Sequence, residues 1–355
     1  MKGIILHGGH GTRLRPLTHT GPKQLLPIAN KPMSQYGIET LKNAGIDDIA
    51  IIVGGIGFNK VKEYYGDGTR FGVKFTYIEQ DYPKGIAHAI SLCKEFIENE
   101  KFAVFLGDNI ILRSISDYVK QFQNSDADAS ILLCEVDNPS RFGIADIQNE
   151  KIIKIIEKPK NPRSNLAVTG IYFLTPIIFD VINRLKPSWR NELEITDALH
   201  MLLEENAKIS YHMITDYWKD TGTPEDILNA NRAVLEKSIP FFDGKKENDV
   251  NLNGNVMVGK NTIIKEDVTI NGPVIIGENC TIESNTSIGP NVSIGNNSIL
   301  SKCKIKDSIV MSDCELKCNI AIRDSIISQK SMLSQTDEKN TDNVFLLGEG
   351  TKIYL

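Results

Sequence analysis

The chain has 355 residues, of which 41% are hydrophobic and 24% are charged, and its net charge is −5 at pH 7. This length favours two domains, because single hydrophobic cores rarely grow beyond roughly 250–300 residues. The acidic balance argues against a general nucleic-acid-binding protein. The sequence contains no run of about 18 apolar residues, so it predicts no membrane-spanning helix.

The N-terminus begins with a short apolar run at 3–6, which a glycine cluster follows. The run is too short for a signal peptide and is typical of a buried strand. Because no export signal precedes it, we expect a cytoplasmic protein. We also expect the six cysteines to be reduced thiols, packed as small apolar groups.

Charge is distributed unevenly along the chain, and the first acidic residue is Glu39. Five cations precede it, namely Lys2, Arg13, Arg15, Lys23 and Lys31. A solvated basic surface usually mixes cations with Asp and Glu. A purely cationic segment in an acidic protein therefore predicts a focused site for a small polyanion.

Short apolar runs alternate with helical periodicity from residue 1 to about 237. We expect strands at 3–6, 49–53, 74–78 and 102–106, and helices at 34–43, 59–65 and 86–96. This alternation predicts a mostly parallel sheet covered on both faces. The loop 8–11 and the segment Gly107-Asp108-Asn109 each follow a strand directly. Both should open at the carboxyl edge of the sheet, where such sheets bind ligands.

The glycine loop lets backbone N–H groups approach phosphate oxygens without hindrance from Cβ atoms. It is not a Walker A loop, because no Gly-Lys-Ser/Thr follows at the required spacing. It is not a dinucleotide fingerprint either, because Leu14 occupies the place of the third glycine. Arg13 can form paired hydrogen bonds to a phosphate, and Lys23 adds a point charge. The loop therefore predicts a phosphate site.

A linker at 238–253 separates this region from an internal repeat. Aliphatic residues recur at strict six-residue spacing, at positions 258, 264, 270, 276, 282, 288, 294 and 300. Small residues recur four places after them, from Val268 to Ser298. A helix cannot produce this period, which is typical of a parallel β-helix. We expect the register to resume at Val310, Leu316 and Ile322 after a four-residue slip, and a polar loop and a last apolar strand to follow residue 330.

Two consecutive motifs carry a resemblance to a known family. Residues 8–18, GGHGTRLRPLT, and residues 22–27, PKQLLP, resemble the signature of the sugar-1-phosphate nucleotidylyltransferases. The KQLLP form resembles the glucose-1-phosphate thymidylyltransferases in particular. The resemblance extends over the whole chain, and the linker and β-helix are similar to the long-form subgroup. One departure is His7, where the family usually has a small residue.

The resemblance implies a role for specific residues. It implies a nucleotide site at Leu6, Gly8, Gly9, Gly11, Thr12, Arg13, Gln80, Gly85 and Asp108, with Gln80 and Gly85 at the pyrimidine edge. It implies a sugar-phosphate site at Asn109, Gly143, Glu157, Lys158 and Val168. The implied catalytic cations are Arg13, Lys23 and Lys158.

An isolated aspartate in a turn is usually structural. Asp108 and Asp220 nevertheless match the GDN and WxDTGT motifs that bind metal in the family, so the resemblance implies Mg²⁺ held by this pair. It further implies in-line attack of a sugar phosphate on the α-phosphorus of a nucleoside triphosphate.

The expected fold is a Rossmann-like, mostly parallel nucleotidyltransferase domain at 1–237 and a left-handed parallel β-helix at 254–330. A linker at 238–253 joins them, and a tail with a terminal strand occupies 331–355. The expected reaction converts dTTP and glucose 1-phosphate into dTDP-glucose and pyrophosphate. We expect a homo-oligomer that assembles through the β-helix, with no nucleic-acid or membrane partner.

Three alternatives stay open at this point. The first is a uridylyltransferase or another sugar-1-phosphate nucleotidylyltransferase of the same fold. The second is a non-catalytic subunit that senses a sugar nucleotide, although the retained Arg13, Asp108, Lys158 and Asp220 favour an active enzyme. The third is a bifunctional enzyme with an acetyltransferase β-helix. All six histidines precede the linker, so we expect no histidine-dependent acetyl transfer.

Overall fold

The computed structural model describes residues 1–9, 11–54, 57–335 and 350–353. The chain forms two compact units. The sheet unit comprises Met1–Gly11, Thr20–Leu25 and Met33–Asp220, and the β-helix unit comprises Thr12–His19, Leu26–Pro32 and Thr221–Leu355. The predicted limits at 237/238, 253/254 and 330/331 stay predictions. The proposed terminal strand lies mostly outside the described residues.

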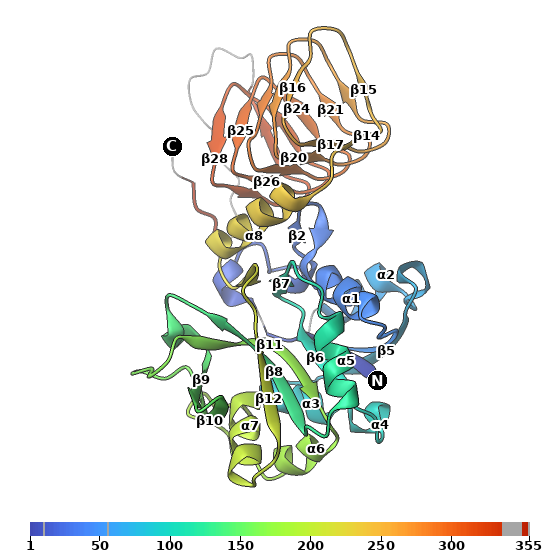
Figure 1. Cartoon of the computed structure of the whole chain (residues 1–355). Helices are drawn as coiled ribbons and strands as arrows, with labels where there is room; N and C mark the ends of the chain where they lie inside the picture. Colours follow the sequence, from blue (N-terminus) through green and yellow to red (C-terminus); the bar gives the residue numbers. More distant parts are fainter. Residues whose placement is uncertain (10, 55–56, 336–349, 354–355) are drawn as a thin grey trace. The chain divides into compact units, whose positions relative to one another are not determined.

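A nine-stranded sheet forms the centre of the sheet unit (Figure 1). Its parallel half contains β1 (Lys2–His7), β4 (Asp48–Val53), β5 (Lys74–Glu79) and β6 (Phe102–Leu106), in the order β6-β1-β4-β5. The other half contains β8 (Ala129–Glu135), β9 (Gly143–Gln148), β10 (Lys151–Glu157), β11 (Leu166–Leu174) and β12 (Ile209–Met213). β11 runs antiparallel to β6, so the sheet is parallel in one half and mixed in the other.

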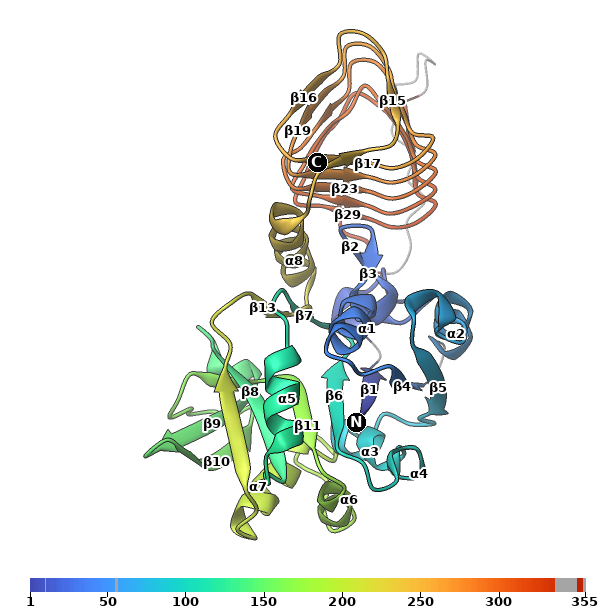
Figure 2. The same ribbon diagram turned by 45° about the vertical axis from the view of Figure 1, so that its right-hand side comes forward.

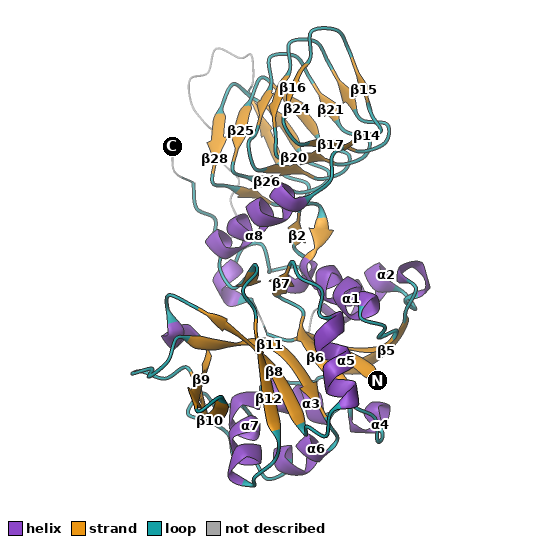
Figure 3. Ribbon diagram, in the orientation of Figure 1, coloured by secondary structure: helices purple, strands orange, loops and turns teal. Residues whose placement is uncertain are grey.

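Helices cover both faces of this sheet, as the alternation predicts (Figure 3). Side chains of α1 (Met33–Asn43), α2 (Phe58–Tyr65) and α5 (Ser116–Asn124) share one apolar core. Side chains of α3 (Ile86–Ser91), α4 (Lys94–Ile97), α6 (Ile177–Ile182) and α7 (Ile195–Glu204) share the other. Ile5 packs in the first core and Ile4 and Leu6 in the second, because successive strand residues point to opposite faces.

The strand order places a topological switch between β1 and β6. The chain passes from β1 outward to β4 and β5, then returns to β6 on the other side of β1. Such a switch opens a crevice beyond the carboxyl ends of the two strands. The predicted glycine loop and Asp108 follow these two strands directly.

The sequence prediction of one helix over 86–96 is wrong in detail, because two short helices occupy this segment. The N–H of Cys93 bonds to the carbonyl of Ile90, three residues back, instead of to one four residues back. This tighter turn ends α3 at Ser91, and α4 begins at Lys94.

The β-helix unit contains α8 (Pro224–Lys237) and the repeat. α8 begins where its residues favour a helix start: the Thr223 side chain accepts a hydrogen bond from the Asp226 N–H, and proline follows Thr223. The unit also holds a short 3₁₀ turn at Thr12–Leu14 and a hairpin of β2 (Pro27–Ile28) and β3 (Lys31–Pro32).

The repeat forms a left-handed parallel β-helix with three sheets, and its stacked three-sided coils are visible in Figure 2. The first sheet contains β14 (Phe241–Phe242), β17 (Val256–Val258), β20 (Val274–Ile276), β23 (Val292–Ile294), β26 (Ile309–Val310) and β29 (Ile326–Ile327). The second contains β15 (Lys245–Lys246), β18 (Ile263–Ile264), β21 (Thr281–Ile282), β24 (Ile299–Ser301), β27 (Glu315–Lys317) and β30 (Met332–Ser334). The third contains β16 (Asn251–Asn253), β19 (Thr269–Asn271), β22 (Ser287–Ile288), β25 (Lys304–Lys306) and β28 (Ala321–Arg323).

The eight predicted six-spaced aliphatic residues are all buried inside the coils, which confirms that part of the pattern. The inferred four-residue slip is wrong. Ile305 stacks on Ile288 and Val310 on Ile294, so each of two successive faces is one residue short and the inward stack is unbroken. The corner residues Lys302 and Asp307 take left-handed φ values of 56° and 48°, which the shortened turns use.

All six cysteines are free, and none of the helices in the described part of the chain is long and apolar enough to cross a membrane.

Candidate active site

The glycine loop leaves β1 at His7. Gly9 and Gly11 have φ values of 89° and 59°, which favour glycine because a Cβ atom is strained there. A Cβ atom on Gly8 or Gly9 would meet no described atom within 4 Å, so packing does not explain these glycines. Gln24 Nε2 donates a hydrogen bond of 2.8 Å to the Gly8 carbonyl, which restrains the start of the loop. His10 lies outside the described residues.

Two predicted site residues, Lys23 and Asp108, are in direct contact. The Gly107 N–H bonds to the Leu6 carbonyl at 3.0 Å, which holds the end of β6 beside the end of β1. Asp108 follows, and its Oδ2 receives the Lys23 ammonium in an ion pair. Burial alone would raise the pKa of Asp108, but the Lys23 charge and the hydrogen bonds to the carboxylate outweigh burial and hold the pKa below its usual range.

The second predicted metal ligand, Asp220, comes from a different part of the chain. β7 (Asn109–Ile111) and β13 (Trp218–Asp220) pair antiparallel, with Asp220 directly opposite Asn109. Residues opposite each other in such a pair have Cα atoms about 4.5–5.5 Å apart. The ribbon therefore brings Asp220 next to the residue that follows Asp108.

Asn109 is buried and held from both sides. Its Oδ1 accepts a hydrogen bond of 2.8 Å from Trp218 Nε1, and its Nδ2 donates one of 3.1 Å to Asp108 Oδ1. Trp218 Nε1 also donates to the Thr169 carbonyl in β11 at 2.9 Å. In this structure the Asn109 amide orients the carboxylate of Asp108.

The predicted sugar-phosphate residues Gly143 and Glu157 form a register pair between β9 and β10. Glu157 Oε2 accepts from Thr196 Oγ1 at 3.1 Å, while Glu157 Oε1 lies 3.4 Å from Lys158 Nζ and 3.3 Å from Arg190 Nη1. A Cβ atom on Gly143 would lie only 2.5 Å from the Thr196 methyl, so glycine is required there. Val168 is buried in β11, where the register shifts before Tyr172.

The predicted base-recognition residues lie between β5 and α3. Gln80 is buried, and its Nε2 is 2.9 Å from His88 Nδ1. Burial, aided by the nearby Lys84 charge, lowers the pKa of His88, which favours the neutral ring that this contact suits. Gly85 has a φ of 103°, and a Cβ atom on it would lie 2.4 Å from the Leu193 carbonyl oxygen. This close approach accounts for the glycine without reference to a base.

Thr12 and Arg13 belong to the β-helix unit and form the first residues of a 3₁₀ turn. The Arg13 guanidinium lies beside Gly222, where a Cβ atom would meet it at 3.1–3.3 Å. Gly222 follows Asp220 by two residues, so an Arg13 contact is built into the WxDTGT segment.

The residues present fit a divalent cation. Asp108 already binds a cation, the Lys23 ammonium, through a carboxylate oxygen, and hard oxygen ligands are those that Mg²⁺ prefers. In the described part of the chain no group of three or more His, Cys, Asp or Glu side chains could hold a metal. Two carboxylates with substrate phosphates and water match the way Mg²⁺ usually binds in proteins.

Comparisons with known proteins agree with this geometry. The sequence profile described as Nucleotidyl transferase matches residues 2–237, and that of the GMPPB C-terminal domain matches residues 270–354. A glucose-1-phosphate thymidylyltransferase of Streptomyces antibioticus is 43% identical over 73% of each chain.

The chain belongs to the sugar-1-phosphate nucleotidyltransferase family.

The nucleotidyltransferase is also similar to a protein of Haloferax volcanii described as "Low-salt glycan biosynthesis nucleotidyltransferase Agl11", at 44% identity over 95% of each chain. Among solved structures, a putative glucose-1-phosphate thymidylyltransferase of Bacillus anthracis is 45% identical, with a TM-score of 0.64. It covers 68% of this chain, and 97% of the solved chain is matched.

Sequence reasoning about the nucleotidyltransferase missed Arg190 and Gln24. Arg190 lies in a loop and contacts the carboxylates of Glu157, Glu192 and Glu194, although no motif marked it. Two glutamates of the segment 192–197, ELEITD, thus hold this arginine in place. Gln24 was noted only as part of KQLLP, and its carbonyl accepts from Ser34 Oγ at 3.1 Å.

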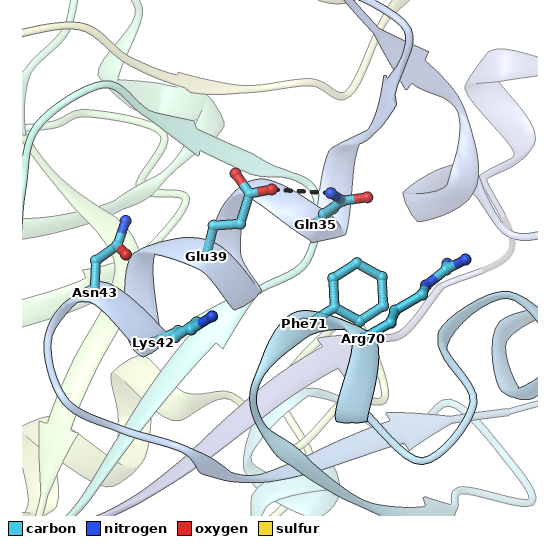
Figure 4. A pocket seen from close by; sticks show the side chains of 6 residues that line it. All are labelled: Gln35, Glu39, Lys42, Asn43, Arg70 and Phe71. Carbon is cyan, nitrogen blue, oxygen red and sulfur yellow. Dashed lines mark hydrogen bonds between the residues drawn. The ribbon is translucent and has the colours of Figure 1, made fainter.

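One surface pocket of the sheet unit lies away from these residues. A pocket of about 450 Å³ lies between α1 and the turn Thr69–Phe71 (Figure 4). It is lined by Gln35, Glu39, Lys42, Asn43, Arg70 and Phe71. None of these is a predicted site residue. Gln35 and Glu39 bond to each other at 2.9 Å, so part of the polar lining is already satisfied.

Proposed function

We propose that this nucleotidyltransferase is a glucose-1-phosphate thymidylyltransferase that converts dTTP and glucose 1-phosphate into dTDP-glucose and pyrophosphate. The observation that carries the proposal is the convergence of Lys23, Asp108 and Asp220 beyond the carboxyl ends of β1 and β6. The choice of dTTP rests on the KQLLP motif and on relatives described as thymidylyltransferases from two Streptomyces species, at 43% and 41% identity.

In the proposed reaction, backbone N–H groups of the Gly8–Thr12 loop bind the triphosphate, and Arg13 and Lys23 neutralise its charge. Gln80 and Gly85 receive the base. Lys158 binds the phosphate of glucose 1-phosphate, and Glu157 accepts hydrogen bonds from the sugar.

A phosphate oxygen of the sugar phosphate forms the new bond to the α-phosphorus, and pyrophosphate leaves from the opposite side. No general base is needed, because the attacking phosphate is already ionised at neutral pH. Mg²⁺ bound by Asp108 and Asp220 would neutralise charge on the phosphates. The protein side chains serve to align the two substrates, and Asn109 holds the Asp108 carboxylate in one orientation.

The test is pyrophosphate release over a grid of nucleoside triphosphates and sugar 1-phosphates, with and without chelator. We expect dTTP with glucose 1-phosphate to be the best pair and chelator to abolish release. If UTP or GTP clearly exceeds dTTP, the thymidylyl assignment is wrong. If no pair is turned over while nucleotide still binds, the sensing-subunit alternative replaces the enzyme.

A cytoplasmic location stays a prediction. We also propose that copies of the chain associate through the β-helix. The first coil offers apolar surface for such contact, because Ile239 is 83% exposed and Phe241 and Phe242 are also exposed. Light scattering after size exclusion tests this. The proposal is supported if the wild type is an oligomer and the double variant Ile239→Lys, Phe241→Lys is a monomer. A monomeric wild type contradicts the proposal.

A further inference from the structure

The β2–β3 hairpin makes a turn that its own sequence does not favour. Ile28 and Lys31 pair, so Ala29 and Asn30 are the two central residues of a two-residue turn. Both have left-handed φ values, 46° and 62°. Hairpins of this kind prefer Asn-Gly, because a side chain such as the alanine methyl is strained at positive φ. Something outside the hairpin must therefore hold Ala29 in this conformation.

The group that holds it is the amide of Asn231 in α8. Asn231 Oδ1 accepts a hydrogen bond of 2.8 Å from the Ala29 N–H and one of 2.7 Å from Ser293 Oγ in β23. Asn231 is only 1% exposed, and Ser293 is also buried. A further bond of 2.6 Å runs from Asn30 Nδ2 to the Ile294 carbonyl. One oxygen atom therefore joins the hairpin, α8 and the β-helix.

The orientation of this amide is fixed by its partners. The Ala29 N–H can only donate, so it must face the oxygen and not the nitrogen of the Asn231 amide. Asn231 Nδ2 is buried and has no hydrogen-bond partner in the described part of the chain. A buried donor without a partner destabilises the fold. The orientation of the amide therefore satisfies the Oδ1 acceptor and leaves the Nδ2 donor unsatisfied, which lowers stability.

Two of the chain segments that leave the candidate site, those after Lys23 and Asp220, run directly into this junction. Lys23 begins the turn Lys23–Leu25, and Ile28 follows three residues after that turn ends. Asp220 ends β13, and α8 begins four residues later at Pro224. The hairpin and α8 are therefore the first elements that could restrain Lys23 and Asp220 from outside the sheet unit.

We propose that Asn231 is a positioning residue for the nucleotide site, which the β-helix supports through Ser293. The hydrogen bonds from Ala29 and Ser293 to one buried oxygen fix the hairpin and α8 to each other and to β23. They thereby limit the conformations that the adjoining Lys23 and Asp220 segments can take. This inference rests on the proposed nucleotidyl transfer, and it gives the β-helix a role in substrate binding by its own chain.

The first experiment compares two buried serines of the β-helix. Ser293→Ala removes a donor to Asn231. Ser298→Ala is the matched control, because Ser298 is equally buried but bonds only to backbone groups of Asn296, Met311 and Cys314 within the coils. We expect Ser293→Ala to raise KM for the nucleotide about fivefold while KM for the sugar phosphate changes little. We expect Ser298→Ala to lower the melting temperature without changing either KM.

The second experiment compares Asn231→Leu with Asn231→Asp. Leucine keeps a branched side chain without polar atoms, whereas aspartate keeps the size of asparagine and an acceptor oxygen. If Asn231 acts only through overall stability, the nucleotide KM of each variant should rise in proportion to the fall in its melting temperature. The positioning role predicts that the nucleotide KM rises further in Asn231→Leu, at least about tenfold, than in Asn231→Asp.

Hydrogen exchange of the peptide containing Ala29 provides a readout that needs no activity. We expect faster exchange in Ser293→Ala and Asn231→Leu, and unchanged exchange in Ser298→Ala. Equal exchange in all variants would overturn the inference. So would a nucleotide KM that changes equally in Ser293→Ala and Ser298→Ala. Kinetics use whichever nucleotide the wild type prefers, so a wrong thymidylyl assignment and a wrong positioning role give different results.

Discussion

At the scale of single residues, the site depends on a carboxylate whose charge is maintained in spite of burial. The Lys23 ammonium, the backbone N–H of Asp108 itself and the Asn109 amide stabilise the ionised form of Asp108. An anion held in this way is ready for a divalent cation at neutral pH. The same ion pair brings the proposed phosphate-binding cation and the proposed metal ligand into contact.

Replacement of Asp108 by asparagine tests the metal assignment. Asp108→Asn keeps the shape of the side chain but removes the charge, so we expect Mg²⁺-dependent turnover to fall by at least about 100-fold. Asp126→Asn is the control, because Asp126 is 80% exposed and pairs with Lys208 on the surface. Pyrophosphate release at several Mg²⁺ concentrations is the measurement, and full activity of Asp108→Asn would refute the assignment.

His7 predicts a dependence of stability on pH. Its ring is buried edge-on against Tyr65, and neither ring nitrogen has a hydrogen-bond partner in the described residues. Burial, opposed only by the Asp108 charge, lowers the pKa of His7 from 6.5 to about 3. Below pH 6.5 the His7 ring is therefore protonated in the unfolded chain, whereas in the folded chain it stays neutral until about pH 3.

Stability from this group is thus complete above pH 6.5 and is lost as the pH falls toward 3, by at most about 1.4 kcal/mol per unit. His7→Ala should flatten the slope of unfolding free energy between pH 4 and 6.5 in denaturant titrations. Cys93→Ala, another buried truncation, should lower stability but keep the slope. A slope unaffected by His7→Ala would contradict the burial of a neutral ring.

At the scale of elements, glycines adjust how closely strands and helices approach. Gly143 in β9 lets the Thr196 side chain of α7 reach Glu157, because a Cβ atom would lie 2.5 Å from the Thr196 methyl. A sequence motif marks such a glycine without revealing its partner. The partner, 53 residues further along the chain, becomes evident only when α7 packs against β10.

Substitution at this contact should be correctable by a second change. We expect Gly143→Ala to displace Thr196 and Glu157 and to raise KM for the sugar phosphate at least about fivefold. Thr196→Ser removes the clashing methyl and keeps the hydroxyl, so Gly143→Ala with Thr196→Ser should recover most of the loss. Thr196→Ser alone is the control. Failure of the second change to help would mean that the clash is not the cause.

The corners of the β-helix explain why asparagine recurs there. Asn261, Asn279 and Asn297 have φ values of 56–59°, and each donates a side-chain hydrogen bond to the equivalent residue of the next coil. Asparagine tolerates left-handed φ better than most residues, and here its amide also links successive coils.

This arrangement separates two contributions to stability. Asn279→Ala loses both the ladder bonds and the conformational tolerance, and we expect a loss of about 2 kcal/mol in the free energy of unfolding. Asn279→Gly loses only the ladder bonds, so we expect about half that loss or less. Urea denaturation measures both. If glycine is as destabilising as alanine, left-handed φ is not the decisive factor at this corner.

At the scale of the whole molecule, the sequence predicts what is periodic or local and misses what depends on crossing segments. The hexads, the parallel strands and the position of the glycine loop each follow from short-range patterns. The two compact units do not, because the chain crosses between them at residues 11/12, 19/20, 25/26, 32/33 and 220/221. The sequence does not predict two side-chain contacts either, that of Arg190 with Glu157 and that of Asn231 with Ala29. They join segments 33 and 202 residues apart that share no motif.

These crossings predict that a chain cut after residue 237 will not keep its native properties. Ile28, Asn231 and Leu235 are buried in the β-helix unit, and Ser293, a partner of Asn231, would be removed with the coils. We expect the 1–237 chain to melt at least about 10 °C below the full chain and to lose most turnover. Circular dichroism melting and pyrophosphate release measure this. An equally stable, fully active short chain would show that the crossings are dispensable.

The ladder between equivalent coils has a consequence for how this protein can change over evolutionary time. Where the coils are regular, residues eighteen apart occupy the same place, as Ile264 and Ile282 do. A gene duplication or deletion of one full coil would therefore preserve every inward contact, whereas insertion of one or two residues would shift the hydrophobic face outward. The corners at 302 and 307 show the other tolerated change, in which one residue is lost at a turn and the inward positions are kept. The length of this domain can thus evolve by whole layers, while its cross-section stays constant.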